Sequence, residues 1–102
     1  MLGDLHALLL GDALKPESRG RLLGWMLANT TGGARLRAGL PSGWAIGDKT
    51  GSGANGTTND LAILWPPGGK PLLVAAYLTG SKLESEKRDA IHANLARALS
   101  AA

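Results

Sequence analysis

The sequence predicts an α+β domain in which helices pack on an antiparallel sheet. Apolar residues recur at helical spacing near both ends of the chain, which predicts helices there. From Trp44 onward the pattern alternates and is broken by glycine- and proline-rich turns, which predicts successive strands. With 102 residues the chain has room for one domain with a modest core.

Three helices are expected before the strands. The first carries leucines at helical spacing up to Gly11, and its apolar face begins without an N-cap residue, which indicates a cut into a longer protein. The second has Pro16 and Glu17 in its first turn, and Gly32 with Gly33 follows it. A shorter helical segment then precedes Pro41. The predicted helices span residues 2–10, 16–29 and 34–39.

The second half of the chain predicts a three-stranded antiparallel meander and a terminal helix. Turn-forming residues separate the extended segments, most clearly in the Pro-Pro-Gly-Gly run that begins at Pro66. Ser81 and Glu84 have the spacing of a capping box, and apolar residues at helical spacing follow them. The predicted strands span residues 44–50, 59–65 and 71–79, and the predicted helix spans residues 82–99.

Composition excludes several classes of function. The chain has no cysteine and only two histidines, so we expect no disulfide, no metal site and no cofactor held by such ligands. The net charge is +3, but the basic residues are dispersed among acids, which does not indicate nucleic-acid binding. No apolar run reaches the roughly 18 residues of a membrane span, and the N-terminus has no signal-peptide pattern.

The run DKTGSGANGTTND, residues 48–60, contains a G-x-G-x-x-G pattern at Gly51, Gly53 and Gly56. A dinucleotide loop needs these glycines before a helix, because the helix N-terminus holds the pyrophosphate, whereas a strand is predicted here. A protein-kinase glycine loop lies between strands, but the chain has no phenylalanine and therefore no Asp-Phe-Gly. The glycines are thus expected to shape a turn.

Lys49, Thr50 and Gly51 offer a different chemistry at the end of a predicted strand. Alternation places the Lys and Thr side chains on opposite faces, yet both can border one groove if the strand lies at a sheet edge. A lysine, a hydroxyl and a bare backbone edge together form a receptor for a carboxylate and an acyl carbonyl. An exposed strand end without function is the alternative.

The surrounding stretches LLLGDAL, PESRGRLLGWMLANTTGGARLRAGLPSGWAIGDKTGSG, GTTND and LWPPGGKP resemble the C-terminal part of a class A serine β-lactamase. This resemblance implies an incomplete portion of the β-lactamase/transpeptidase-like fold. It further implies that Lys49 gives electrostatic support and that the Thr50 hydroxyl binds the substrate carboxylate next to Gly51. The backbone N–H of Ser52 would form half of the oxyanion hole, and its hydroxyl would also touch the carboxylate.

One substrate-binding group departs from the pattern of many relatives. These place an arginine at the position of Thr58, whereas Arg35 matches the alternative place from which other members supply that guanidinium. We therefore expect Arg35 to be an accessory substrate residue, with an ordinary surface arginine as the alternative. Arg37 is expected to make a structural ion pair with Asp48 or Asp60.

The other conspicuous residues are given structural roles. Trp25, Trp44 and Trp65 lie in apolar patterns and are expected in the core. The two histidines, His6 and His92, are expected at surface or partly buried positions rather than as catalytic bases. Lys15 stands where the family commonly has a Ser or Thr cap, and the loss of that cap should cost about 1 kcal/mol.

The catalytic serine and its base are missing. None of the six serines begins a Ser-x-x-Lys motif, and Ser-Asp-Asn is absent. The resemblance implies that these motifs and an omega-loop glutamate belong to an N-terminal part that this chain lacks. The 102 residues would then hold only one wall of the active site, and the chain is expected to be inactive alone.

Two interpretations therefore stand. In one, the chain is part of a periplasmic or secreted enzyme that hydrolyses β-lactams when the N-terminal part is present. In the other, it is a non-catalytic fragment that self-assembles into a homo-oligomer through the open edge of strand 71–79. A penicillin-binding transpeptidase, which shares Lys-Thr-Gly, fits the WPPGG and TTND stretches less well.

Overall fold

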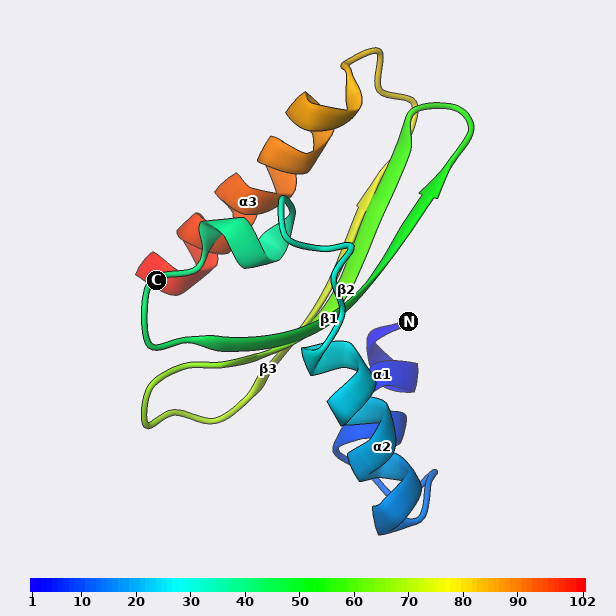
Figure 1. Cartoon of the computed structure of the whole chain (residues 1–102), viewed down its shortest axis with the longest axis vertical. Coiled ribbons are helices and arrows are strands. Elements are labelled where there is room, and N and C mark those ends of the chain that lie inside the picture. The colour runs from blue at the N-terminus through cyan, green and yellow to red at the C-terminus, as the bar shows by residue number, and fades with distance from the viewer.

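The computed structural model describes all residues from Met1 to Ala102 and confirms the α+β class. Three strands form one antiparallel sheet in the order β1-β2-β3. Helices α1 and α2 cover one face of the sheet, whereas η1 and α3 cover the other (Figure 1). The elements are α1 (Leu2–Leu9), α2 (Pro16–Leu27), η1 (Leu36–Gly39), β1 (Ala45–Gly53), β2 (Thr57–Trp65), β3 (Leu72–Leu78) and α3 (Ser85–Ala101).

The central strand β2 supplies apolar side chains to both faces of the sheet. Ala62 and Leu64 face η1 and α3, where they pack with Leu36 and Ala96. Ile63 faces the other way and packs against α1 and α2. Because successive side chains of a strand alternate, one buried strand ties two separate cores together.

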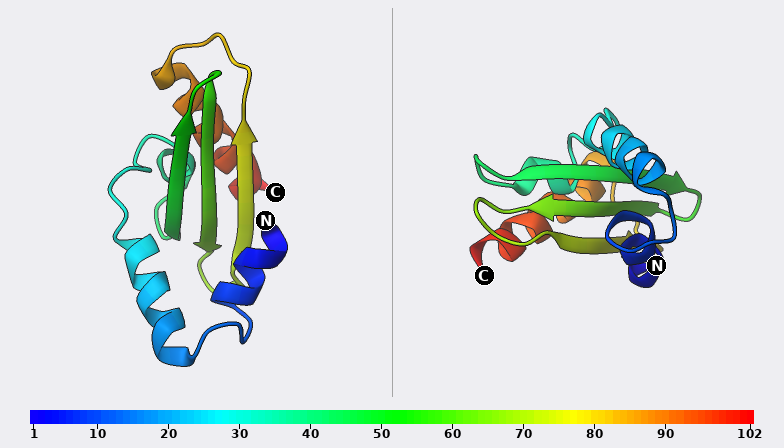
Figure 2. Two further views of the ribbon diagram at one scale, coloured as in Figure 1. Left: turned by 90° about the vertical axis from the view of Figure 1, so that its right-hand side faces the viewer. Right: turned by 90° about the horizontal axis from the view of Figure 1, so that it is seen from below.

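The α1 and α2 core lies over only part of its sheet face. Its buried members are Leu5, Leu9, Met26 and Ile63. Figure 2 shows α1 in front of β3 and α2 beside β1, both toward one end of the sheet. The other end of this face is therefore left without a covering helix.

The second and third helical segments are shorter than predicted. Helix α2 ends at Leu27 instead of residue 29, and Asn29 turns its side chain to Asp48, 3.2 Å from the carboxylate oxygen. The segment predicted as helix at 34–39 is a single 3-10 turn, Leu36–Gly39. Gly39 lies so close to the backbone of Ala93 in α3 that a β-carbon would collide with it. The prediction missed these tertiary contacts.

The β1–β2 hairpin explains the glycine pattern. Strand β1 runs on to Gly53, beyond the predicted end at residue 50, and β2 begins at Thr57 instead of residue 59. Asn55 and Gly56 take positive φ values of 68° and 63° in the connecting turn, a conformation that these two residue types tolerate. The glycines thus belong to a hairpin and form no loop before a helix.

The predicted capping box of the last helix is wrong. Helix α3 begins at Ser85 rather than residue 82, with Glu84 as an N-cap residue that makes no side-chain capping bond. The hydroxyl of Ser81 instead accepts the N–H of Leu83 at 3.1 Å. Ser81 therefore shapes the β3–α3 connection instead of capping the helix.

Two further burial predictions are wrong. Trp25 is 67% exposed, although Trp44 and Trp65 are partly buried as core neighbours. His92 is buried, and its Nε2–H donates to the carbonyl oxygen of Thr58 at 2.9 Å. Helical spacing identified the apolar stripe of α2 but not which side of it remains uncovered.

Strand β3 lies at one edge of the sheet and β1 at the other. Leu72 and Tyr77 of β3 are large exposed side chains. A long strand edge with exposed apolar side chains favours pairing with another strand. No helix of the chain is both long and apolar enough to cross a bilayer.

The missing cap of α2 can be tested by substitution. Lys15 is the N-cap residue, with extended backbone and no side-chain capping bond, and Pro16 follows as the first helical residue. Lys15→Ser should stabilise the fold by about 1 kcal/mol, because the hydroxyl accepts an N–H of the first turn. Urea unfolding followed by circular dichroism measures the change. Lys15→Ala, which removes the same charge without adding an acceptor, is the control, and an equal gain in both variants would contradict the capping explanation.

Candidate functional site

The Lys49–Ser52 segment lies on β1, an edge strand of the sheet, so the Lys49 and Thr50 side chains can border one groove from opposite faces. Lys49 points to the α1/α2 face, where it lines a pocket with residues of both helices. Thr50 points to the opposite face, where its hydroxyl lies 2.6 Å from that of Thr31. The Lys49 ammonium donates to the carbonyl oxygen of Thr50 at 2.7 Å. The two side chains therefore flank one free strand edge from its two sides.

Arg35 joins this segment to the rest of the fold. Its Nη2 donates to the Ser52 hydroxyl at 2.6 Å, and its Nη1 donates to the carbonyl oxygens of Gly51 and Asn59 at 3.1 and 2.8 Å. Its Nε donates to the Asp89 carboxylate at 2.9 Å. Arg35 is 8% exposed, so the guanidinium is a buried cation that makes four charge-assisted hydrogen bonds. The alternative of an ordinary surface arginine is wrong.

Arg37 makes the expected structural ion pair. Its Nη2 lies 3.0 Å from Oδ1 of Asp48, which is fully buried and also accepts from the Asn29 amide. Asp48 immediately precedes Lys49, so this pair fixes the strand just before the exposed lysine. Gly32 packs against the same carboxylate, where a β-carbon would collide.

Asp48 and Asp60 form a buried acidic pair beneath the strand. Asp60 Oδ2 accepts the N–H of Leu36 at 3.3 Å, while Oδ2 of Asp48 and Oδ1 of Asp60 have no other partner. Burial, followed by the hydrogen bond and the negative charge of Asp48, raises the pKa of Asp60 from 3.8 to about 8, even though the N–H of Leu36 and the charge of Arg35 lower it. We therefore treat Asp60 as protonated at neutral pH, donating its proton toward Asp48.

A second arginine reaches the site from α3. Thr58, the position at which many relatives carry an arginine, is buried, and its hydroxyl accepts from Arg88 Nε at 2.8 Å. The backbone carbonyl of Thr58 accepts from His92. Arg88 also donates to Leu83 O at 2.7 Å. A guanidinium is thus supplied beside this position by a different element.

Of the predicted site residues, Arg35, Gly51 and Ser52 are brought into direct contact, whereas Lys49 lies on the other face of the same strand. Sequence analysis missed Asp89, Arg88 and Thr31. Asp89 is separated from Arg35 by 54 positions, so no local pattern could have paired them. Asp89 and Arg88 were visible only as members of a charged helix face.

The arrangement can bind an anion and orient an acyl group. Hydroxyls of Thr50 and Ser52 and the guanidinium of Arg35 lie along one side of a free strand edge, and an ammonium lies on the other side. A group that attacks the acyl carbon is absent from this surface, because Ser52 is the acceptor of the Arg35 bond and has no basic partner. These features place hydroxyls, a guanidinium and an ammonium around one free strand edge of a partial sheet-and-helix fold.

The comparisons identify the family. The model of the beta-lactamase enzyme family (Beta-lactamase2) matches residues 1–102, and the chain therefore belongs to this family. A beta-lactamase of Citrobacter koseri is 47% identical over 97 residues, and one of Streptomyces albus G is 47% identical over 92 residues. These matches cover 95% and 90% of this chain but 33% and 29% of those proteins.

Solved structures agree with the fold and assign the class. The structure of the last common ancestor of Gram-negative bacteria (GNCA4) beta-lactamase class A is 53% or 54% identical over the aligned part in two of its forms, each with a TM-score of 0.96. The class A enzyme PenP of Rhodopseudomonas palustris is 52% identical, with a TM-score of 0.95. Each match covers 99% of this chain and at most 39% of the other. The chain is thus a partial class A beta-lactamase, spanning about a third of the length of the curated relatives it matches.

The buried acidic pair predicts an unusual pH dependence. The folded-state pKa of Asp60, about 8, lies above the ordinary 3.8, so between these values the folded state holds a proton that the unfolded state releases. The contribution of this bound proton to the free energy of unfolding is fully present below about pH 4. It is lost as the pH rises to about 8, with a slope of at most about 1.4 kcal/mol per pH unit. Asp60→Asn mimics the protonated form and should flatten the decline, as measured by urea unfolding at each pH. Asp12→Asn at an exposed acid is the control, and an unchanged slope in Asp60→Asn would contradict the shared proton.

The Arg35 bridge predicts a large cost of substitution. Arg35→Lys cannot reach Asp89, Ser52 and two carbonyls at once, and should destabilise the fold by about 3 kcal/mol because a partly buried carboxylate and two backbone carbonyls lose their donor. Arg37→Lys is the matched control, since a lysine can still reach the single Asp48 oxygen, and it should cost less than about 1 kcal/mol. Thermal unfolding measures both variants. Equal destabilisation by the two variants would contradict the larger contribution assigned to the Arg35 hydrogen bonds.

Proposed function

We propose that this chain is the C-terminal portion of a β-lactam-hydrolysing serine enzyme and supplies the wall that binds the substrate carboxylate and half of the oxyanion hole. The whole enzyme would act in the periplasm or outside the cell. The observation that carries the proposal is the Lys49–Ser52 segment on a free sheet edge, tied to a buried guanidinium. Identity of about half with class A enzymes over nearly all of this chain supports it.

The positions of these residues support each proposed role. Thr50 and Ser52 alternate onto the same face, so their hydroxyls can bind one carboxylate together. The Ser52 N–H serves as an oxyanion donor on the edge strand. Lys49, exposed and unpaired with any acid, adds positive charge from the other side. Arg35 orients Ser52 and attracts the carboxylate mainly through its charge, because four of its five N–H groups already donate within the chain.

The isolated chain is proposed to be inactive. Neither Ser-x-x-Lys nor Ser-Asp-Asn occurs in it, so the surface lacks an activated serine and a general base. The remaining part of the enzyme would bring these groups to the Lys49 side of β1 and would pair with the open edge of β3.

The second candidate is a non-catalytic homo-oligomer. The specific observation in its favour is β3, an edge strand that carries the exposed side chains of Leu72 and Tyr77. Two copies could pair these edges around a twofold axis. The two candidates compete for the same edge, so they can be separated by one set of samples.

Complementation tests the proposal. The purified chain is mixed with the separately expressed part of the Citrobacter koseri enzyme that this chain does not match, and nitrocefin hydrolysis is followed. We expect no hydrolysis by either part alone and measurable hydrolysis by the mixture. Lys49→Ala should reduce the rate of the mixture by about 100-fold, as for other electrostatic groups at acyl-transfer sites, whereas Lys70→Ala at an exposed turn should not.

Three outcomes would contradict the proposal. Hydrolysis by the chain alone, or acylation of one of its serines seen by intact mass, would place a nucleophile in it. A stable dimer by light scattering that does not exchange with the added part would favour the self-assembling fragment. An active mixture that is insensitive to Lys49→Ala would remove the lysine from the site.

A further inference from the structure

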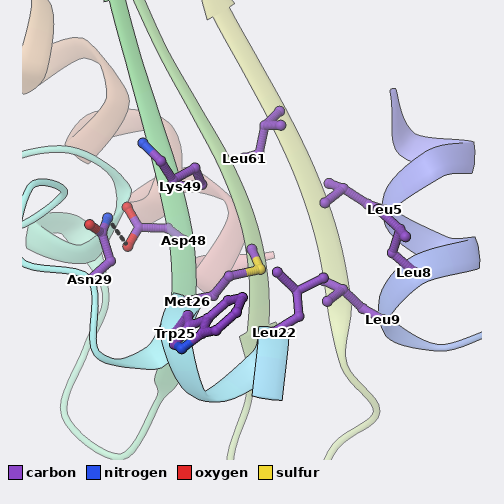
Figure 3. A pocket seen from close by; sticks show the side chains of 10 residues that line it. All are labelled: Leu5, Leu8, Leu9, Leu22, Trp25, Met26, Asn29, Asp48, Lys49 and Leu61. Atoms are coloured by element: carbon purple, nitrogen blue, oxygen red, sulfur yellow. Dashed lines mark hydrogen bonds between the residues drawn. The ribbon is translucent and has the colours of Figure 1, made fainter. Parts of the chain in front are cut away.

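A chain of hydrogen bonds leads from the buried Asp48 carboxylate to the Thr50 hydroxyl at the sheet edge. The side-chain amide of Asn29 donates to Asp48 Oδ1 at 3.2 Å, as Figure 3 shows. The Oδ1 atom of Asn29 accepts the backbone N–H of Thr31 at 3.2 Å and the Thr31 hydroxyl at 2.9 Å. The Thr31 hydroxyl in turn lies 2.6 Å from that of Thr50. The segment between α2 and η1 is thereby bonded to β1 at two positions.

The orientation of the Asn29 amide is fixed from both sides. Its Nδ2 faces Asp48, the carboxylate that pairs with Arg37 and that can only accept a hydrogen bond from the amide. Its Oδ1 faces the backbone N–H of Thr31, which can only donate. The reverse orientation would set two oxygens against each other at Asp48 and two donors against each other at Thr31. Asn29 Oδ1 is therefore the acceptor for both groups of Thr31.

A single proton decides the direction of the next hydrogen bond. A threonine hydroxyl has one proton to donate, and that of Thr31 goes to Asn29 Oδ1. In the 2.6 Å contact between the two hydroxyls, the Thr31 oxygen therefore accepts and Thr50 donates. The Thr50 hydroxyl turns its proton toward Thr31, so it offers only lone pairs to a ligand at the strand edge.

The Ser52 hydroxyl has the opposite hydrogen-bond polarity. Its oxygen accepts from Arg35 Nη2 at 2.6 Å, and its own proton makes no hydrogen bond within the chain. Ser52 is exposed and lies two residues after Thr50, on the same face of β1. Two neighbouring hydroxyls of one face thus present a donor at Ser52 and an acceptor at Thr50.

We propose that Thr31 is a positioning residue that sets the polarity of the Thr50 hydroxyl, so that a ligand carboxylate binds Ser52 directly but binds Thr50 only by displacing the Thr31 hydrogen bond. The inference rests on the proposed function and adds a selectivity to it. A neutral amide fits the resting polarity, with its carbonyl facing Ser52 and its N–H facing Thr50, whereas both oxygens of a carboxylate need donors. Thr31 is exposed, so water can donate to its oxygen when the Thr50 hydroxyl rotates away.

Hydroxyl exchange measured by NMR on the isolated chain tests the direction of the bond. The Thr50 hydroxyl proton should exchange slowly with water in the original chain and in Thr31→Ser, which keeps the acceptor. In Thr31→Val, which has the shape of threonine without the hydroxyl, exchange should be about tenfold faster. Thr30→Val, at the exposed neighbouring position, should leave the exchange rate unchanged. Circular dichroism checks that each variant keeps its fold, and Thr31→Ala serves as a second deletion of the hydroxyl.

Titration with benzoate and benzamide, followed by the backbone amide shifts of Thr50 and Ser52, tests the consequence for binding. Thr31→Val should tighten benzoate binding about fivefold, because the Thr50 hydroxyl is then free to donate. The same variant should leave the benzamide affinity within about twofold, because Thr50 can still accept. Thr31→Ser should restore the preference of the original chain, which a merely structural role of this position would not predict.

Three results would overturn the inference. An exchange rate that Thr31→Val leaves unchanged would show that Thr50 does not donate to Thr31. Equal benzoate affinity in Thr31→Val and the original chain would show that this hydrogen bond does not compete with a carboxylate, and no benzoate binding to either would reject the selectivity together with the carboxylate site. Failure of the proposed function alone would differ: benzoate would bind Ser52→Ala as tightly as the original chain, while Thr31→Val still released the Thr50 proton and tightened benzoate.

Discussion

The guanidinium of Arg35 is the constraint on which the site wall depends. It lies just before η1 and bonds to the ends of β1 and β2 and to α3, elements that are far apart in sequence. A buried cation is costly unless it is paired and hydrogen-bonded, and Asp89 with two carbonyls and a hydroxyl meets that requirement. The same bonds that offset the burial of this charge also fix Ser52 at the edge of the sheet.

The sheet then divides the chemistry between two faces. Alternation along β1 places Lys49 with α1 and α2, and Thr50 and Ser52 with η1 and α3. Each face has its own small core, and the buried strand β2 joins them. A free β1 edge between the two faces leaves groups from both sides within reach of one ligand, as the proposed carboxylate-binding role requires. The buried Asp48 and Asp60 beneath it add a proton-dependent component to this support.

The sequence predicted the fold well where local signals agreed with the tertiary structure. The α+β class and the three-strand order were correct because periodicity and turn residues are readable locally. The ion pair of Arg37 was also predicted, but only folding decided between Asp48 and Asp60 as its partner. The predicted capping box does not form because the Ser81 hydroxyl accepts a hydrogen bond from the N–H of Leu83 in the same turn. Trp25 was expected in the core, yet its side chain is 67% exposed at the margin of a pocket between α1, α2 and the sheet.

The site was predicted only in part, for a similar reason. Lys49, Thr50, Gly51 and Ser52 form a contiguous motif and could be found by resemblance, whereas Asp89 is brought to Arg35 only by folding. The buried state of Arg35 could not be read from a segment that looks polar. Long-range contacts of single polar residues leave no periodic signal in one sequence.

The most direct test of the account is the solvent exchange of the Arg35 Nε–H, followed by nitrogen-resolved NMR on the isolated chain. The account predicts a resolved, slowly exchanging signal that Asp89→Asn weakens, because this N–H is buried and donates to the Asp89 carboxylate. Exposed Arg97 provides the reference for rapid exchange. Exchange of Arg35 as fast as that of Arg97 would show that the wall is not formed in this chain, and would contradict the central claim.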